Sequence, residues 1–449
     1  MASHLTCGRG RGLGARVAGA MLAGGVAAVL GGLATARAAD QPEPTPTVAA
    51  LTTCATTATK TAVIGVLAPV TGGGMAADAQ DVVNAAKLAV SELNAAGGVC
   101  GAGARYKFDV VVADTEGERN DAVVTGFRRL STTPDLNFIM TGYASTSNFE
   151  LDLMARAKMP YLLSANSEQT AAMVTKHPDG YPTVWSRVPS YSGYNTDLPP
   201  LLDRLIAQGA LKLPGKTVYI IGSDDPYGST IARGLTESFT AAGWSIVGSE
   251  TVPFQSVTDW RPQLERIRAA KPGVIVNTNS SPASDATFFN QFIEQPTDSL
   301  VFLQYAPSIP EFNKLTNNKA EGVLFNMLGG AIDSRADTKE IAQKYAKAYG
   351  PGGYFSVVAY EDVLLYGLCI HNGTDPTDRM AMGKCIGALD VDTPSGRLAF
   401  DPVTHLARHG ESYTPTLFYQ VGADGRNVII SPANVADSSF HQPSWMVAK

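Results

Sequence analysis

Two short runs of hydroxyl and amide side chains each follow an apolar segment and precede a predicted helix. Hydroxyl groups at the start of a helix cap its free N–H groups, and together with them they can hold a carboxylate. The alternative is that both runs only cap helices and bind nothing. We predict a ligand site that contains Tyr143, Ser145, Thr146 and Ser147 of the first run and Ser164, Asn166, Ser167 and Glu168 of the second.

Similar residues follow apolar segments in the second half of the chain. In Gly222–Gly228, Tyr227 could lie against a ligand, and Asp224 or Asp225 could meet a cation. The alternative is that Asp225 caps the following helix and Tyr227 packs the turn. We predict that Asp225 and Tyr227 belong to the ligand site, together with residues after two later apolar segments, which are Asn279, Ser280 and Tyr305.

The sequence lacks the common motifs of catalytic and metal sites. It contains no G-x-S-x-G nucleophile elbow, no Walker loop and no H-E-x-x-H zinc motif. His405 and His409 have the i,i+4 spacing of a zinc pair on a helix, but no third ligand is evident. We therefore predict a protein with no enzymatic activity, no metal and no cofactor.

Apolar segments typical of strands alternate with segments of helical spacing, in two successive sets. This alternation predicts an α/β protein with two doubly wound, Rossmann-like lobes, each built on a parallel sheet. Ligands bind beyond the carboxyl ends of the strands in such sheets, which is where the polar residues fall. The first set has strands at 61–69, 108–113, 138–140 and 161–163, with helices at 79–95, 121–130 and 149–158. The second has strands at 217–222, 246–252, 274–277 and 301–303, with helices at 198–208, 229–242, 260–270 and 286–294.

More elements follow the second set. The pattern predicts strands at 323–327, 398–400, 416–421 and 428–430, and helices at 339–348, 357–371 and 380–388. A chain that completes two lobes and then adds further helices and strands crosses between the lobes more than once.

The first 38 residues have the features of a secretory signal peptide. Arg9, Arg11 and Arg16 precede an apolar run over 17–33, and Ala36-Arg37-Ala38 is a small-x-small cleavage pattern. A retained membrane anchor is the alternative. Cleavage predicts an exported protein, periplasmic or at the cell surface, that begins with a flexible leader over 39–60.

Length and charge restrict the possible partners. The 449 residues exceed what one hydrophobic core usually holds, so two domains are expected. Removing the four arginines of the signal peptide changes the net formal charge from −6 to −10. A net acidic chain argues against nucleic acid as a partner and leaves a small-molecule ligand open.

Four cysteines remain after the signal peptide is removed. An even number in an exported chain suggests two disulfides. Of three possible pairings we favour Cys54–Cys100 and Cys369–Cys385, with free buried thiols as the alternative. Residues 51–54 also faintly resemble a lipoprotein processing site, which would place a lipid on Cys54.

The order of these segments resembles the leucine/isoleucine/valine-binding, or branched-chain amino-acid/amide, family of type I periplasmic binding proteins. The resemblance spans about residues 61–430. The segments that carry it are Ile64–Gly72, Ala85–Val99, Val112–Thr115, Ile139–Ser147, Lys158–Tyr161, Asp225–Gly228 and Lys319–Val323.

The resemblance implies a solute-binding protein of an ABC importer, monomeric, that encloses its ligand between two lobes and passes it to a membrane permease. Lobe I would comprise 61–187 and 327–393, and lobe II 188–326 and 394–449. Three hinge crossings would lie near 185–188, 325–329 and 393–396. Ser145 would hold a ligand carboxylate, aided by residues 164–168, and Tyr227 would contact the ligand from lobe II.

Three departures from the family bear on the ligand. The second helix start has Asn166 and Glu168 where a Thr and smaller residues are usual. Members that bind amino acids carry an acid that pairs with the α-ammonium, at a position that here falls within Gln304–Pro307. An aromatic residue of the first loop is replaced by Gly74 or Met75. Either Asp224, Asp225 or Glu168 supplies the missing charge, or the ligand is an amide, a urea or a carboxylate without an ammonium. A ligand-sensing receptor on the same fold is the alternative function.

Overall fold

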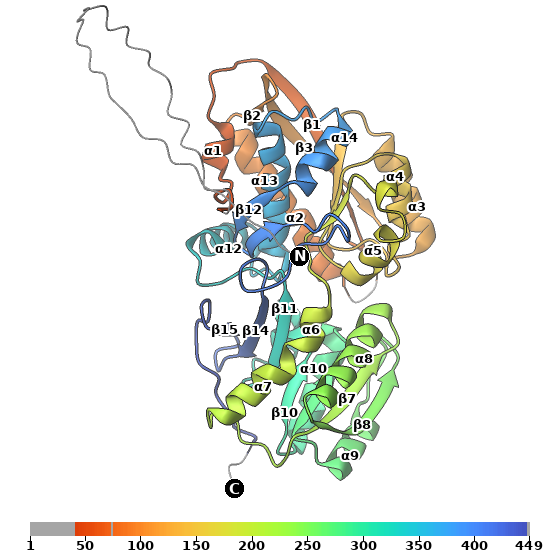
Figure 1. The fold of residues 1–449 in the computed structure, drawn as a ribbon, viewed down its shortest axis with the longest axis vertical. Coiled ribbons are helices and arrows are strands. Elements are labelled where there is room, and N and C mark those ends of the chain that lie inside the picture. Colours follow the sequence, from red (N-terminus) through yellow and green to blue (C-terminus); the bar gives the residue numbers. More distant parts are fainter. Residues whose placement is uncertain (1–40, 73–74, 447–449) are drawn as a thin grey trace, which may run out of the picture. The chain divides into compact units, whose positions relative to one another are not determined.

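The computed structural model describes residues 41–72 and 75–446 (Figure 1). The predicted signal peptide and Gly74 lie outside the described residues. Two separate sheets organise the chain from Pro42 onward, and each has helices on both faces.

The first sheet has six strands in the order β2-β3-β1-β4-β5-β6, and only β2 runs antiparallel to its neighbour. Helices α2 and α13 pack on one face, and α3 and α4 pack on the other. The strands are β1 (Thr59–Ala68), β2 (Val99–Gly101), β3 (Ala104–Asp114), β4 (Leu136–Thr141), β5 (Tyr161–Leu163) and β6 (Val184–Ser186). The helices of this lobe are α2 (Ala76–Ala95), α3 (Asn120–Ser131), α4 (Glu150–Arg156), α5 (Ser167–Val174), η1 (Pro178–Gly180), α12 (Ala336–Tyr349), α13 (Phe355–His371) and α14 (Arg379–Gly387).

The second sheet has seven strands in the order β15-β14-β11-β10-β9-β7-β8, with β14 and β15 antiparallel. Helices α7 and α8 cover one face of this sheet, and α9 and α10 cover the other. The strands are β7 (Thr217–Ser223), β8 (Ser245–Val252), β9 (Val274–Asn277), β10 (Leu300–Leu303), β11 (Leu324–Leu328), β14 (Thr416–Val421) and β15 (Asn427–Ser431). The helices are α6 (Ser192–Thr196), α7 (Leu198–Ala207), α8 (Pro226–Ala241), α9 (Arg261–Ala270), α10 (Pro282–Glu294), η2 (Ala306–Ser308) and α11 (Pro310–Leu315).

The predicted fold class, two doubly wound α/β lobes, is confirmed. The strands are buried along nearly their whole length where helices cover both faces, as in β9 and β10. Continuous apolar runs such as Val274-Ile275-Val276 therefore gave a reliable strand signal, because both faces of the strand must be apolar.

The chain passes between the sheets three times. It leaves the first sheet after β6, returns to the first core after β11, and joins the second sheet again at β14. A hairpin of β12 (Asp390–Thr393) and β13 (Gly396–Ala399) precedes that last passage. Leu398 and Phe400 still pack in the core of the first sheet. The lobe boundaries inferred from the sequence remain predictions.

The leader is anchored over residues 42–58, contrary to the flexible segment expected. Glu43 exchanges backbone hydrogen bonds of 2.7 Å with Asp390 and Asp392, which adds a strand-like segment to β12. Helix α1 (Val48–Thr52) follows, and its Leu51 is buried in the first core. The Pro- and Thr-rich composition concealed this anchoring, because the contacts are made with residues far away in the sequence.

Both predicted disulfides, Cys54–Cys100 and Cys369–Cys385, are confirmed. In each pair the Cα atoms are 5.9 Å apart. The first ties the leader to β2, and the second joins α13 to α14. Among the described residues, no helix combines the length and apolar character needed to span a membrane.

Candidate functional site

A cavity lies between the two sheets and is lined by residues of both. It contains about 680 Å³ of space that no protein atom fills, part of which is open to solvent. Nine of the nineteen lining residues follow the carboxyl ends of β4, β5, β7, β9 and β10. The lining includes Met75, Glu118, Tyr143, Thr146, Ser164, Asn166, Tyr191, Tyr194, Asp225, Tyr227, Phe254, Ser280, Tyr305, Tyr354 and Phe355.

Tyrosine rings form much of the wall. The ring of Tyr227 meets that of Tyr191 at 5.2 Å and that of Tyr194 at 6.0 Å, both edge to face. The Tyr227 hydroxyl accepts a hydrogen bond from Gln304 Nε2 at 3.0 Å, and the Tyr194 hydroxyl accepts one from the Leu328 amide at 3.1 Å. Burial raises the pKa of Tyr194 to about 12, so its hydroxyl stays protonated at neutral pH. This wall can pack against an apolar or aromatic body and offers hydroxyl groups to a polar one.

A hydrogen bond joins the two lobes at the edge of the cavity. The hydroxyl of Tyr305, which precedes η2, donates to Asp78 Oδ2 on α2 at 2.5 Å. Asp78 is 1% exposed, and burial raises its pKa to about 7, although the Tyr305 bond opposes this rise. The contact therefore holds lobe II against a buried carboxyl of lobe I.

Several cavity residues have unusual backbone conformations. Glu118, Asn166, Ser280 and Tyr305 have positive φ angles of 68°, 53°, 61° and 67°. Such conformations are uncommon for residues other than glycine and are concentrated at functional sites. Local strain at the lining is consistent with a site that the rest of the fold holds in place.

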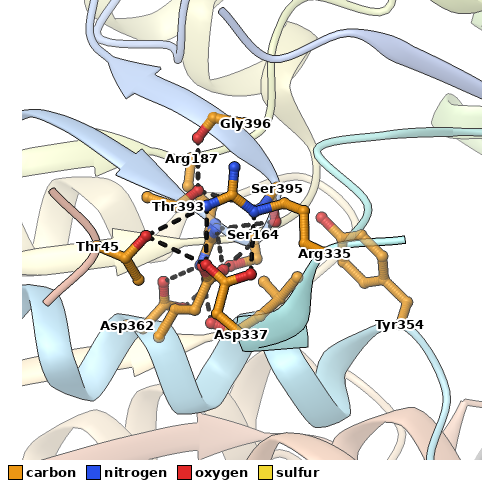
Figure 2. A network of polar contacts seen from close by, with 12 residues as sticks. Thr45, Ser164, Arg187, Arg335, Asp337, Tyr354, Asp362, Thr393, Ser395 and Gly396 are labelled. Atoms are coloured by element: carbon orange, nitrogen blue, oxygen red, sulfur yellow. Dashed lines mark hydrogen bonds and ion pairs between the residues drawn. The ribbon is translucent and has the colours of Figure 1, made fainter. Parts of the chain in front are cut away.

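A buried ion network positions Ser164 (Figure 2). The Ser164 hydroxyl donates to Asp362 Oδ2 at 3.3 Å, and Asp362 Oδ1 accepts from Arg187 at 2.8 Å. Arg187 also donates to Glu361 at 2.6 Å and to Ser395 at 3.3 Å. Burial alone would lower the pKa of Arg187, but the two carboxylates raise it above its usual range. Arg187 thus links the first crossing, helix α13 and the β12–β13 turn behind the cavity.

A family model of periplasmic binding proteins matches residues 61–426. The chain belongs to the periplasmic binding protein family. The match covers most of the chain and includes the segments that supply the cavity.

Solved structures of similar proteins agree with this assignment. A putative branched-chain amino acid ABC transporter protein from Silicibacter pomeroyi is 26% identical, with a TM-score of 0.77 over 86% of this chain and 100% of that one. LivJ of Streptococcus pneumoniae, solved with isoleucine, is 18% identical, with a TM-score of 0.65 over 83% of this chain and 100% of that one. The leucine-binding protein LivK of Thermotoga maritima is 17% identical, with a TM-score of 0.65 over 82% and 98%. No curated protein sequence matches the chain.

The cavity of this periplasmic binding protein gathers most, but not all, of the residues predicted from the sequence. Those that line it are Tyr143, Thr146, Ser164, Asn166, Asp225, Tyr227, Ser280 and Tyr305. Those outside the lining are Ser145, Ser147, Ser167, Glu168 and Asn279. Met75, from the first loop, is also in the wall.

Ser145, expected to hold a carboxylate, is turned away from the cavity. Its hydroxyl is buried and donates to Glu150 Oε2 at 2.5 Å. The cause is the buried Glu150 carboxyl, which needs a donor and lies only five residues along the chain. Thr146 takes the place next to the cavity.

The acids proposed to replace the missing charge already have partners. Glu168 Oε1 accepts from Ser190 Oγ at 2.6 Å and from the Tyr191 amide at 2.7 Å. Asp225 caps α8 by accepting from the amides of Tyr227 and Gly228, each at 3.0 Å. Asp224 accepts from the Phe254 amide at 2.8 Å.

The histidine pair forms no metal site. His405 Nδ1 is 3.0 Å from the Val184 carbonyl oxygen, and His409 Nε2 is 2.9 Å from the Thr416 hydroxyl. In the part of the chain that the structure describes, no group of three His, Cys, Asp or Glu side chains could hold a metal ion.

Several lining residues were not predicted from the sequence. Glu118 follows β3, so the rule that located the other strand ends applies to it as well. Tyr191, Tyr194 and Tyr354 lie outside strand ends, in segments beside the crossings. No local pattern marks them, because their position depends on how the lobes pack.

Glu150 makes the stability of the protein depend on pH. Burial raises its pKa from 4.5 to about 7, so between these values the unfolded chain loses a proton that the folded protein keeps. Stability from this group therefore falls as the pH rises from about 4.5 to 7. We expect Glu150→Gln to raise the melting temperature at pH 8 and to flatten its decline between pH 4.5 and 8. The exposed Glu237→Gln serves as the control, and an equal slope in both variants would contradict the assignment.

Proposed function

We propose that this protein is an exported solute-binding protein of an ABC importer. It captures a small polar ligand, such as an amino acid, an amide or a small carboxylate, between its lobes and delivers it to a membrane permease. It acts as a monomer, catalyses no reaction, and works in the periplasm or at the cell surface. The observation that carries the proposal is the cavity between the sheets, lined from both. The predicted signal peptide and the two disulfides support export.

The start of helix α5 offers a place for an acceptor group of the ligand. Ser164 and Asn166 line the cavity just before this helix, and the Asn166 side chain at its N-cap makes no capping hydrogen bond. Free N–H groups and the helix dipole favour a carboxylate or carbonyl oxygen there. By contrast, Asp225 occupies the start of α8, so that helix has no free capping position.

A thermal-shift screen over amino acids, amides and small carboxylates tests the function. A ligand at 100 times its dissociation constant adds about 2.7 kcal/mol of stability, which raises the melting temperature measurably. We expect at least one class of compound to do so without being consumed.

A pair of tyrosine variants controls for binding at the cavity. Tyr227→Ala, in the cavity wall, should reduce the shift. Tyr349→Ala, at a ring that is 45% exposed, should leave the shift unchanged. A screen without any stabilising compound, or turnover of a compound that binds, would contradict the proposal.

A further inference from the structure

We infer that the ligand carries a positively charged amino or ammonium group and that Glu118 binds this group. The inference rests on the proposed function and narrows its ligand class. It excludes simple amides and simple carboxylates, which the proposed function leaves open.

Glu118 is an acid of the cavity with an unused oxygen. It lies in the loop between β3 and α3 and belongs to the cavity lining. Its Oε2 atom is buried and has no hydrogen-bond partner. Burial, and then the charge of Asp225, raises the pKa of Glu118 to about 7. A buried carboxylate without a partner is unfavourable, so a cation bound there gains more than it would at a solvated acid.

Two other acids near the cavity, Asp225 and Glu168, are less available. Both oxygens of Asp225 accept hydrogen bonds, from Ser223 Oγ and from two amides at the start of α8. Glu168 is held by Ser190 and Tyr191 of the first crossing. Among these acids, Glu118 is the one whose side chain can turn its charge to a ligand without breaking a helix cap or a hinge contact.

Positively charged side chains are missing from the described residues of the cavity wall. None of its described lining residues is Lys, Arg or His. Arg187 precedes the lining residue Val188, but Glu361 and Asp362 pair with it at 2.6 and 2.8 Å. A ligand whose only charge is negative would therefore face two acids and no base.

The aromatic wall favours a cation independently of Glu118. The cavity combines Tyr143, Tyr191, Tyr194, Tyr227, Tyr305 and Tyr354, and ring faces attract amines and quaternary ammonium groups. This attraction is strongest where water is excluded, as between two closed lobes. The acid and the rings thus select the same charge.

Glu118 belongs to lobe I and Asp225 to lobe II. A cation bound between them therefore also changes the stability of the closed arrangement of the lobes. The charge of Asp225 contributes to the raised pKa of Glu118. The charge of Glu118 in turn contributes to the raised pKa values of Tyr143 and Glu150 in lobe I. With the cavity empty, the two like charges oppose the closed arrangement. A cation bound between them replaces repulsion by two attractions, which couples ligand charge to closure.

The test compares ligand charge at a constant carbon skeleton. Alkyl- and arylalkylamines, each matched by the primary amide and the carboxylate of the same skeleton, are screened by thermal shift, and the best amine is titrated by calorimetry. We expect the amines to raise the melting temperature and their matched partners not to. Glu118→Gln should weaken the best amine by roughly 10- to 100-fold, because a hydrogen bond to a charge is lost.

Two further variants separate binding from folding. Glu116→Gln changes an acid of the same loop that is 54% exposed and paired with Arg119, and it should leave the affinity unchanged. Glu118→Asp keeps the charge and should retain part of the affinity. We expect the unliganded melting temperature of Glu118→Gln to be no lower than that of the wild type.

The outcomes also distinguish the inference from the proposed function. An amide or carboxylate that binds as tightly as its matched amine overturns the inference alone, and so does an unchanged affinity in Glu118→Gln. If no compound of any class binds, both the inference and the proposed function fail.

Discussion

Replacing Arg187 with alanine is expected to lower the free energy of unfolding by about 3–5 kcal/mol, the usual cost of breaking a buried ion pair. The side chains of Arg187, Glu361 and Asp362 are 1%, 4% and 1% exposed. Without the guanidinium, two carboxylates remain buried with no cation to compensate them. Chemical denaturation followed by circular dichroism measures the loss.

Two comparisons isolate the cause of this loss. Arg119→Ala removes an arginine that is 58% exposed and also contacts two acids, and we expect a change within about 1 kcal/mol. Combining Arg187→Met with Glu361→Gln and Asp362→Asn removes all three charges and should recover much of the stability. A triple variant as unstable as Arg187→Ala would show that lost side-chain packing, and not uncompensated charge, causes the loss of stability at this site.

Removing the Cys54–Cys100 disulfide by a double serine substitution is expected to cost about 4 kcal/mol in the chain-entropy description. The bond closes a loop with a sequence separation of 46, and without it the unfolded chain gains freedom. The Cys369–Cys385 bond has a separation of 16, and its loss should cost less, about 3 kcal/mol. Melting temperatures of both double variants, with and without reductant, measure the two effects.

The reductant provides the control. Each double variant should respond less to reductant than the wild type, because only one bond remains to be reduced. A larger loss for the Cys369–Cys385 variant would contradict the loop-length explanation and indicate that the packing between α13 and α14 matters more.

The architecture was predictable because its signals are local. Apolar runs such as those of β7 and β9 reflect burial on both faces, and helices such as α3 show their spacing in a short window. Both disulfide pairings followed from a choice among three. The leader over 42–58 was missed because its contacts, such as Glu43 with β12, join residues more than 300 positions apart.

The candidate site was predictable only where it follows the strand ends. The expectation that a ligand binds beyond the carboxyl ends of the strands correctly identified Ser164, Tyr227 and Tyr305 as cavity residues. It could not foresee that Glu150 would take the Ser145 hydroxyl, since a buried acid is not visible in the sequence. Nor could it find Tyr354, which reaches the cavity from the start of α13.

The anchored leader determines how the molecule responds to a tether. From Pro42 to Cys54 the chain is fixed to the first lobe by backbone pairing with β12, by buried Leu51 and by the covalent bond to Cys100. A tether attached before Pro42, whether a surface linker or a purification tag, therefore pulls on that lobe alone. Protein immobilised through its N-terminal side should leave the second lobe free to swing, and so should keep the full affinity that it has in solution.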